Sequence, residues 1–143
     1  MTSPFDRLQI GPLTLRNRFI KSGANEAMSR EGLPTKAMLK HHGDLARGGI
    51  GMTTVAYGAV NEAGRTLANQ IVMTESSIND LSALTDEIHR NGAAASIQIT
   101  HGGSFITGLR VKGATISSSS GINKAGLLSG NLWQRAMKEK DMQ

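Results

Sequence analysis

Residues 51–60 read Gly-Met-Thr-Thr-Val-Ala-Tyr-Gly-Ala-Val, and this mostly apolar, β-branched run decides the fold class. A run of this kind predicts a strand buried on both faces, as the strands of parallel sheets are. Just before it, Thr35 is suited to cap a helix and Gly48-Gly49 to end one. Between those ends, helical spacing predicts an apolar face made of Met38, Leu39, His42, Leu45 and Ala46.

A second helix and a further strand follow in the sequence. Ser77-Ile78-Asn79-Asp80 resembles a capping box with Asp in place of Glu, and Asn91-Gly92 ends the helical pattern. The inward face expected for this helix consists of Ile78, Leu81, Leu84, Thr85 and Ile88. Residues 93–100 then predict a strand that ends at His101-Gly102-Gly103. Strands alternating with helices of this length imply βαβ units and a parallel sheet.

The chain opens with residues 8–16, which alternate around Gly11-Pro12 and predict a small β-hairpin, and residues 19–22 predict a short strand. We therefore expect an α/β fold, a partial (β/α)₈ TIM barrel with an N-terminal β-hairpin and its first three β/α units. A complete barrel needs about 250 residues, and this chain has 143. Residues 1–103 carry the pattern, whereas residues 104–143 are rich in Gly and Ser and show no clear further unit.

Composition excludes several classes of protein. The chain has no Cys, which excludes a disulfide scaffold, a thiolate metal site and a cysteine nucleophile. No apolar run approaches the roughly 18 residues needed to span a membrane, and the N-terminus lacks a basic-then-apolar signal pattern. We therefore expect a cytoplasmic protein with no membrane partner.

The net charge of +5 is unevenly distributed, because residues 88–138 contain no Asp or Glu. Such a stretch favours anions such as phosphates, or it is a solvated loop whose acidic partners lie elsewhere in a larger protein. Its basic residues are spread out and scarcely interleaved with aromatics. We therefore expect no nucleic-acid partner.

In a parallel barrel, binding and reactive groups lie at the C-terminal ends of the strands. Three segments fall there, and they are residues 22–25, 57–59 and 98–103. Gly23 and Ala24 would let backbone approach a flat ligand, and the amides of Asn25 and Gln98 can both donate and accept hydrogen bonds. A flavin's pyrimidine edge, a donor N–H between two carbonyl acceptors, needs that kind of partner.

The histidines are less informative. His101 is suited to bind substrate, to act as a base or to serve a structural role. His41-His42 lie on the first predicted helix, where we expect partial exposure, and no Asp or Glu stands at metal-site spacing from them. The sequence alone therefore assigns them no function and predicts no metal site. It also lacks the motifs of a zincin, a P-loop enzyme or a Rossmann dinucleotide site.

Several strings occur together in an order that resembles the N-terminal part of the Old Yellow Enzyme family, the NADH:flavin oxidoreductases. Pro4-Phe5-Asp6 leads into Leu8-Gln9-Ile10-Gly11 and Leu13-Thr14-Leu15-Arg16-Asn17-Arg18. The other strings are His41-His42-Gly43-Asp44-Leu45-Ala46-Arg47-Gly48-Gly49, Val60-Asn61-Glu62-Ala63-Gly64-Arg65 and Gln98-Ile99-Thr100-His101-Gly102-Gly103. The resemblance covers about residues 4–103 and resumes at residues 135–142.

The resemblance implies an FMN enzyme that takes hydride from NADH or NADPH and reduces activated alkenes, typically α,β-unsaturated carbonyls. It implies that residues 104–143 are a loop over the active-site face followed by the start of the next helical region. Carried over by position, the residues that contact the flavin are Ser22, Gly23, Ala24, Asn25, Tyr57 and Gln98, and His101 is a candidate substrate ligand.

This sequence also departs from the family. The Thr or Cys that often follows the first strand is absent, Tyr57 occupies a position that is usually small, and Ser104 replaces a frequent Arg. The family's substrate-binding His pair, its proton-donating Tyr and its FMN-phosphate loops match no part of these residues. We therefore expect the chain to lack the full reductase cycle on its own.

The alternatives are an inactive barrel fragment that self-associates through exposed sheet edges, as a homo-oligomer, and an anion-binding module.

Overall fold

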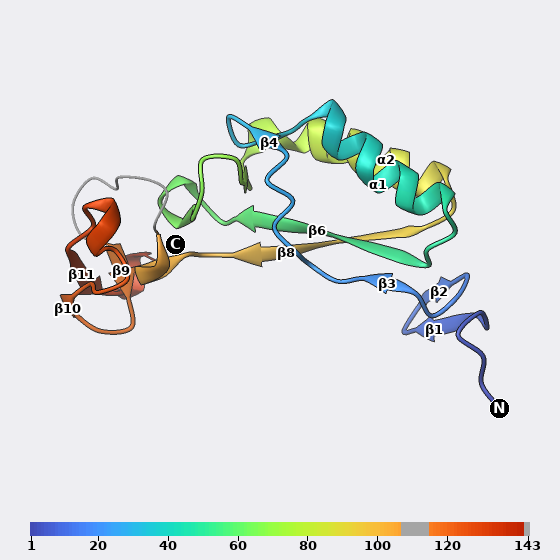
Figure 1. Ribbon diagram of the computed structural model, residues 1–143, viewed down its shortest axis with the longest axis horizontal. Helices are drawn as coiled ribbons and strands as arrows, with labels where there is room; N and C mark the ends of the chain where they lie inside the picture. The colour runs from blue at the N-terminus through green and yellow to red at the C-terminus, as the bar shows by residue number, and fades with distance from the viewer. Residues whose placement is uncertain (107–114, 142–143) are drawn as a thin grey trace.

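The computed structural model of the protein describes residues 1–106 and 115–141 (Figure 1). The chain begins with the predicted antiparallel hairpin, formed by β1 (Leu8–Ile10) and β2 (Leu13–Leu15). Gly11 in the connecting turn has a φ of +53°, a left-handed conformation that glycine adopts without a steric penalty. The hairpin lies at one end of the molecule, beside the start of the central sheet.

The central sheet is parallel, as the alternation of strands and helices predicts. Its middle strand is β6 (Met52–Ala59), and β8 (Ala94–Thr100) pairs with β6 along nearly its full length. On the other edge of β6, β3 (Ile20–Lys21) pairs with its beginning and β7 (Ile71–Val72) with its end. The C-terminal ends of β6 and β8 therefore point to the same side of the sheet.

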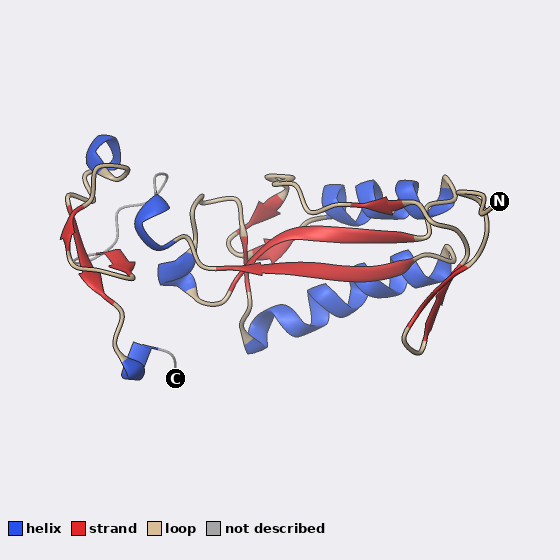
Figure 2. Ribbon diagram, turned by 90° about the horizontal axis from the view of Figure 1, so that it is seen from below, coloured by secondary structure: helices blue, strands red, loops and turns tan. Residues whose placement is uncertain are grey.

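Two helices cover one face of this sheet (Figure 1), and Figure 2 shows them side by side. They are α1 (Lys36–Arg47) and α2 (Ile78–Arg90). The Thr35 hydroxyl accepts a hydrogen bond from the Met38 amide, so the predicted N-cap of α1 is confirmed. The core between helices and sheet is built from Met38, Ala46, Val55, Ile71, Leu84, Ile88 and Ala93.

Helix α2 begins at Ile78 after Ser77, as the sequence predicts, but the predicted capping contact is absent. Ser77 lies in a 3₁₀ turn, Glu75–Ser77, and its hydroxyl accepts a hydrogen bond from the Thr74 amide at 3.2 Å instead of capping α2. The expected capping box with Asp80 is therefore wrong. Ile78, expected to face inward, is 57% exposed, because it occupies the first turn of the helix on its outer side. Leu84 and Ile88 are buried as predicted.

The remaining strands are short. β4 (Ser29–Arg30) and β5 (Leu33–Pro34) form a hairpin before α1. Beyond the C-terminal ends of β6 and β8 lies a small sheet (Figure 1) of β9 (Thr115–Ser117), β10 (Gly121–Ile122) and β11 (Trp133–Ala136), in which β11 is central. The other 3₁₀ turns are Glu62–Gly64, Gly103–Phe105, Leu127–Ser129 and Glu139–Asp141.

These elements form one wall of a barrel. Within residues 1–106 and 115–141, no helix covers the second face of the sheet, and the sheet does not close. The small sheet β9–β11 lies in the segment expected to be an active-site loop followed by the start of the next helical region, and residues 107–114 of that segment lie outside the described residues. None of the described helices combines the length and apolarity required to cross a bilayer.

Candidate functional site

The segment after β3, Ser22 to Asn25, runs along β6 and presents mostly exposed residues. Its far end is tied to the sheet because the Glu26 amide donates a hydrogen bond to the Ala56 carbonyl oxygen at 3.3 Å. The side chain of Asn25 accepts a hydrogen bond from the Ala27 amide at 3.1 Å. The segment follows the first strand of the sheet, as the sequence predicts, and the hydrogen bond of the Glu26 amide holds its end beside β6.

Gly23 lies directly against Gln98 of β8. A Cβ on Gly23 would overlap Oε1 of Gln98 and would stand 3.4 Å from the Cβ of Ala56. Gln98 is exposed, and among the described residues its side-chain amide forms no hydrogen bond. Two of the predicted flavin contacts, far apart in sequence, are thus adjacent in space, and the amide between them is available to a ligand.

Tyr57 lies within β6, not after it as the sequence suggested. The pairing of β6 with β8 is irregular there, because Ala56 faces Gln98 and Gly58 faces Ile99, so Tyr57 is an extra residue between two paired positions. The side chain of Tyr57 is half-buried. The irregularity places Tyr57 immediately after the residue that pairs with Gln98.

His101 is held by local contacts at the end of β8. Its Nδ1 accepts a hydrogen bond from the Gly103 amide at 3.1 Å. A Cβ on Gly64 would stand 2.6 Å from Cδ2 of His101, so the ring packs directly on that glycine. The ring is half-buried, and these contacts fix its position whatever else it binds.

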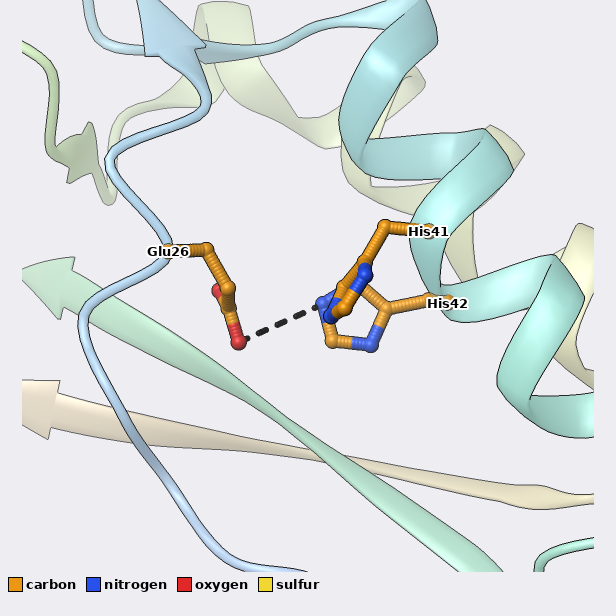
Figure 3. A group of neighbouring side chains, drawn as sticks. All are labelled: Glu26, His41 and His42. Atoms are coloured by element: carbon orange, nitrogen blue, oxygen red, sulfur yellow. Dashed lines mark ion pairs between the residues drawn. The ribbon is translucent and has the colours of Figure 1, made fainter.

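Sequence reasoning missed a cluster formed by Glu26, His41 and His42 (Figure 3). The expectation that His42 is partly exposed is wrong, because its side chain is completely buried on the side of α1 that faces β6. Oε1 of Glu26, which is 4% exposed, lies 3.6 Å from Nε2 of His42. Helical spacing did indicate the inward position of His42. Glu26 gave no such signal, because it lies in an irregular segment well before α1.

The carboxylate of Glu26 has several partners. The Lys21 ammonium group forms an ion pair with Oε1, and the Ala56 amide donates to Oε2 at 3.1 Å. Burial raises the pKa of Glu26, but the His42 ring, the Lys21 ammonium and the Ala56 amide favour the charged form and together hold that pKa below its usual value. Burial and the neighbouring His42 lower the pKa of His41. Glu26 is therefore an anion that anchors the chain after Asn25.

The segment that follows β3 and the Gln98 side chain on β8 together fit the edge of a flavin. The absence of a side chain on Gly23 leaves room for the Gln98 amide, and that amide offers a donor and an acceptor on the exposed side of the sheet. Next to it lies a mostly exposed stretch of chain, formed by Ser22, Gly23, Ala24 and Asn25. This arrangement can hold a flat, polar-edged ring through contacts from the segment after β3 and from β8, the two strands that flank β6.

Parallel strands, helices on one face and polar groups toward the C-terminal ends of the strands define the class as a (β/α)₈-type wall with a candidate flavin edge. The family model of the NADH:flavin oxidoreductase / NADH oxidase family matches residues 4–143. The chain therefore belongs to the NADH:flavin oxidoreductase / NADH oxidase family, and the resemblance to Old Yellow Enzymes is confirmed.

Among curated proteins, the chain is 40% identical over 117 residues to 4,4'-dithiodibutanoate disulfide reductase of Rhodococcus erythropolis, covering 82% of this chain and 29% of that protein. It is 28% identical over 106 residues to NADPH dehydrogenase of Listeria welshimeri, covering 72% of this chain and 31% of that protein. The chain therefore spans about a third of these relatives or less.

Solved structures show the same fold. Morphinone reductase in complex with tetrahydroNAD superposes with a TM-score of 0.82 at 15% identity, over 99% of this chain and 42% of that one. The Old Yellow Enzyme homologue from Zymomonas mobilis gives a TM-score of 0.79 at 17% identity, over 99% of this chain and 41% of that one. The described elements thus correspond to part of each neighbour's chain, consistent with an unclosed barrel wall.

Proposed function

We propose that this chain forms the isoalloxazine-facing wall of an FMN-dependent NAD(P)H oxidoreductase that reduces activated alkenes. The observation that carries the proposal is the contact of Gly23 with Gln98, in which an exposed side-chain amide of β8 lies against the segment that follows β3. Membership of the NADH:flavin oxidoreductase / NADH oxidase family supports flavin as the cofactor. Neighbours named as a tetrahydroNAD complex and as an NADPH dehydrogenase support a nicotinamide donor.

Each residue has a definite part in this proposal. Gln98 and Asn25 bind the polar edge of the ring, while Ser22, Gly23 and Ala24 lie along it with their backbone. Tyr57 bounds the ring from β6, and His101 faces the substrate side at the end of β8. A bound flavin would supply hydride transfer from NADH or NADPH to the β-carbon of an α,β-unsaturated carbonyl compound. The substrate's α-carbon then takes a proton, and none of these residues is assigned to donate it.

An organic disulfide is a second candidate substrate. The specific observation in its favour is the 40% identity to a protein named as a disulfide reductase, over 82% of this chain. In that reaction one hydride and one proton convert one disulfide into two thiols. The absence of Cys from the chain excludes a thiol relay on these residues, so hydride would have to pass directly from the flavin to sulfur.

Self-association is the non-catalytic alternative for this chain. Among the described strands, β8 pairs only with β6, so its outer edge offers unpaired backbone groups to another chain. Large apolar side chains are also exposed near and beyond the C-terminal end of β8. They are Ile99, Phe105 and Trp133, which are 59%, 70% and 64% exposed. A homo-oligomer would bury both the edge and these side chains.

The test combines the intact mass of the purified 143-residue chain with its flavin spectrum and its turnover. We expect a perturbed flavin spectrum and no NAD(P)H-dependent reduction of either a cyclic enone or a dithiodicarboxylate. Turnover by this chain alone would contradict the expectation that further groups are required. A colourless oligomer that leaves the spectrum of added FMN unchanged would favour the self-associating fragment.

A further inference from the structure

The His42 side chain is buried, and its two ring nitrogens differ in their contacts. Nδ1 lies 2.8 Å from the Thr53 hydroxyl, whereas Nε2 is shielded from solvent and has no hydrogen-bond partner within residues 1–106 and 115–141. A buried polar atom left without a partner destabilises the fold. The Thr53 contact fixes the ring so that Nε2 points at the Glu26 carboxylate (Figure 3).

The spacing of these atoms suits a shared ion better than a direct bond. Nε2 of His42 and Oε1 of Glu26 are 3.6 Å apart, beyond ordinary hydrogen-bond reach. Two ligands at about 2.0–2.2 Å from one tetrahedral zinc ion stand roughly 3.3–3.5 Å from each other. A ring nitrogen of His41 completes the group, and one ligand atom from each residue lies within 4.8 Å of the others.

We propose that Glu26, His41 and His42 form a binding site for a divalent transition-metal ion of the zinc class. Two imidazoles and one carboxylate are a ligand set that zinc accepts, with a fourth position left for water. The Thr53 hydroxyl acts as the outer partner that orients a metal-binding histidine through its other ring nitrogen. The site lies between α1 and the segment after β3, and it does not depend on flavin binding.

The site has an approach from solvent. His41 is half-buried and lines a surface cavity of ≈ 670 Å³, together with Phe5, Phe19 and Leu45. The ion can therefore reach His41 first, while His42 and Glu26 lie behind it. An entry path of this kind is one of the features that a metal site requires.

Lys21 competes for the same carboxylate. Its ammonium group pairs with Oε1 of Glu26 and donates to the Thr54 carbonyl oxygen at 3.0 Å. A bound dication and this ammonium would share one oxygen and repel each other. Removing the charge with Lys21→Met is therefore expected to tighten metal binding. If Lys21 only held the cluster in place, the same substitution would weaken metal binding.

The experiment titrates Zn²⁺ into the full chain by calorimetry after dialysis against a chelator. We expect one ion per chain, with binding lost in Glu26→Gln and in His41→Ala, while His89→Ala, which changes an exposed histidine of α2, leaves it unchanged. His41 is half-buried on the helix surface, so His41→Ala is expected to fold, and circular dichroism of each variant checks this.

A second pair of variants tests the surroundings of the site. Thr53→Val should weaken Zn²⁺ binding by about 10- to 100-fold, the usual effect of removing an outer partner, and Lys21→Met should strengthen it. No saturable Zn²⁺ binding by the folded chain, or binding that depends on His89 and not on His41, would overturn the proposal. The cluster would then be a buried Lys–Glu–His contact that holds the chain without metal.

Discussion

Gly23, just after β3, and Gln98, on β8, lie so close that any side chain on Gly23 would overlap the Gln98 amide oxygen. The contact joins two strands that are separated by β6 in the sheet, and it lies on the exposed side of the wall. It sets the position of the Gln98 amide, which is one of the two side-chain amides proposed to bind the flavin edge. The predictions about the cofactor therefore depend on this pair.

Gly23→Ala is expected to displace the Gln98 amide and to weaken flavin binding. Because Oε1 is the tip of a flexible side chain, the fold should tolerate the change, with stability altered by about 1 kcal/mol or less. Riboflavin titration followed by fluorescence, beside a thermal melt, measures both effects. Gly121→Ala in β10 is the matched control, because nothing lies within 4 Å of a Cβ there. Undiminished riboflavin affinity in Gly23→Ala would remove the basis for this contact.

Leu84→Ala is expected to destabilise the chain by about 2–5 kcal/mol, because it leaves a cavity in the core. Leu84 is completely buried between α2 and the sheet. Ile78→Ala in the same helix should change stability by only about 0.5 kcal/mol, since Ile78 is 57% exposed. Urea unfolding of the two variants checks the comparison, and equal losses would mean that the start of α2 is wrongly placed.

The Arg135–Asp141 pair is expected to make the end of the chain sensitive to acid. Both guanidinium Nη atoms lie 2.6 Å from the Asp141 carboxylate oxygens, and the Lys138 amide also donates to it at 2.8 Å. The Arg135 contact and the Lys138 amide lower the pKa of Asp141 well below its usual range.

A carboxyl whose folded-state pKa is lowered stabilises the fold above its unfolded pKa, and this stabilisation begins to be lost near the unfolded pKa and disappears as pH falls through the folded pKa. The ordinary pKa of an aspartate in an unfolded chain is about 3.9. The Met137 amide donates a hydrogen bond to the Ser117 carbonyl oxygen at 2.8 Å, and it reports on the stability of this region. Its hydrogen-exchange protection, compared with that in Asp141→Asn, should therefore fall between pH 5 and pH 3. A difference between the two proteins that stays constant across that range would contradict the predicted titration of Asp141.

Hydrophobic periodicity predicted the central elements. The apolar run around Val55, the N-cap at Thr35 and the strand that carries Gln98 are local patterns, so they can be recognised without knowledge of the rest of the fold. The cap of α2 was misjudged, because Ser77 ends a 3₁₀ turn and its hydroxyl accepts a hydrogen bond from the Thr74 amide instead of capping the helix. Strands β9 to β11 were missed, because two to four residues in a Gly- and Ser-rich stretch show no alternation.

The two candidate sites differ in how much of each could be predicted from the sequence. Gln98 and Gly23 were predicted through the family resemblance, which fixes their positions after two strands. The approach of Glu26 to His42 could not be predicted, because it depends on how an irregular segment packs against a helix. Single carboxylates in such segments carry no periodic pattern, and only the fold brings this one under α1.

The central claim is that these residues hold a flavin by its ring, and titration of the chain with riboflavin and with FMN tests it most directly. We predict that both ligands show the same spectral shift with similar affinity, because the described contacts reach the ring and not the phosphate. Gln98→Ala should weaken both by about 3- to 10-fold, the effect of one net hydrogen bond of about 0.5–1.5 kcal/mol. No spectral change with either ligand, or full affinity without the Gln98 amide, would contradict the account.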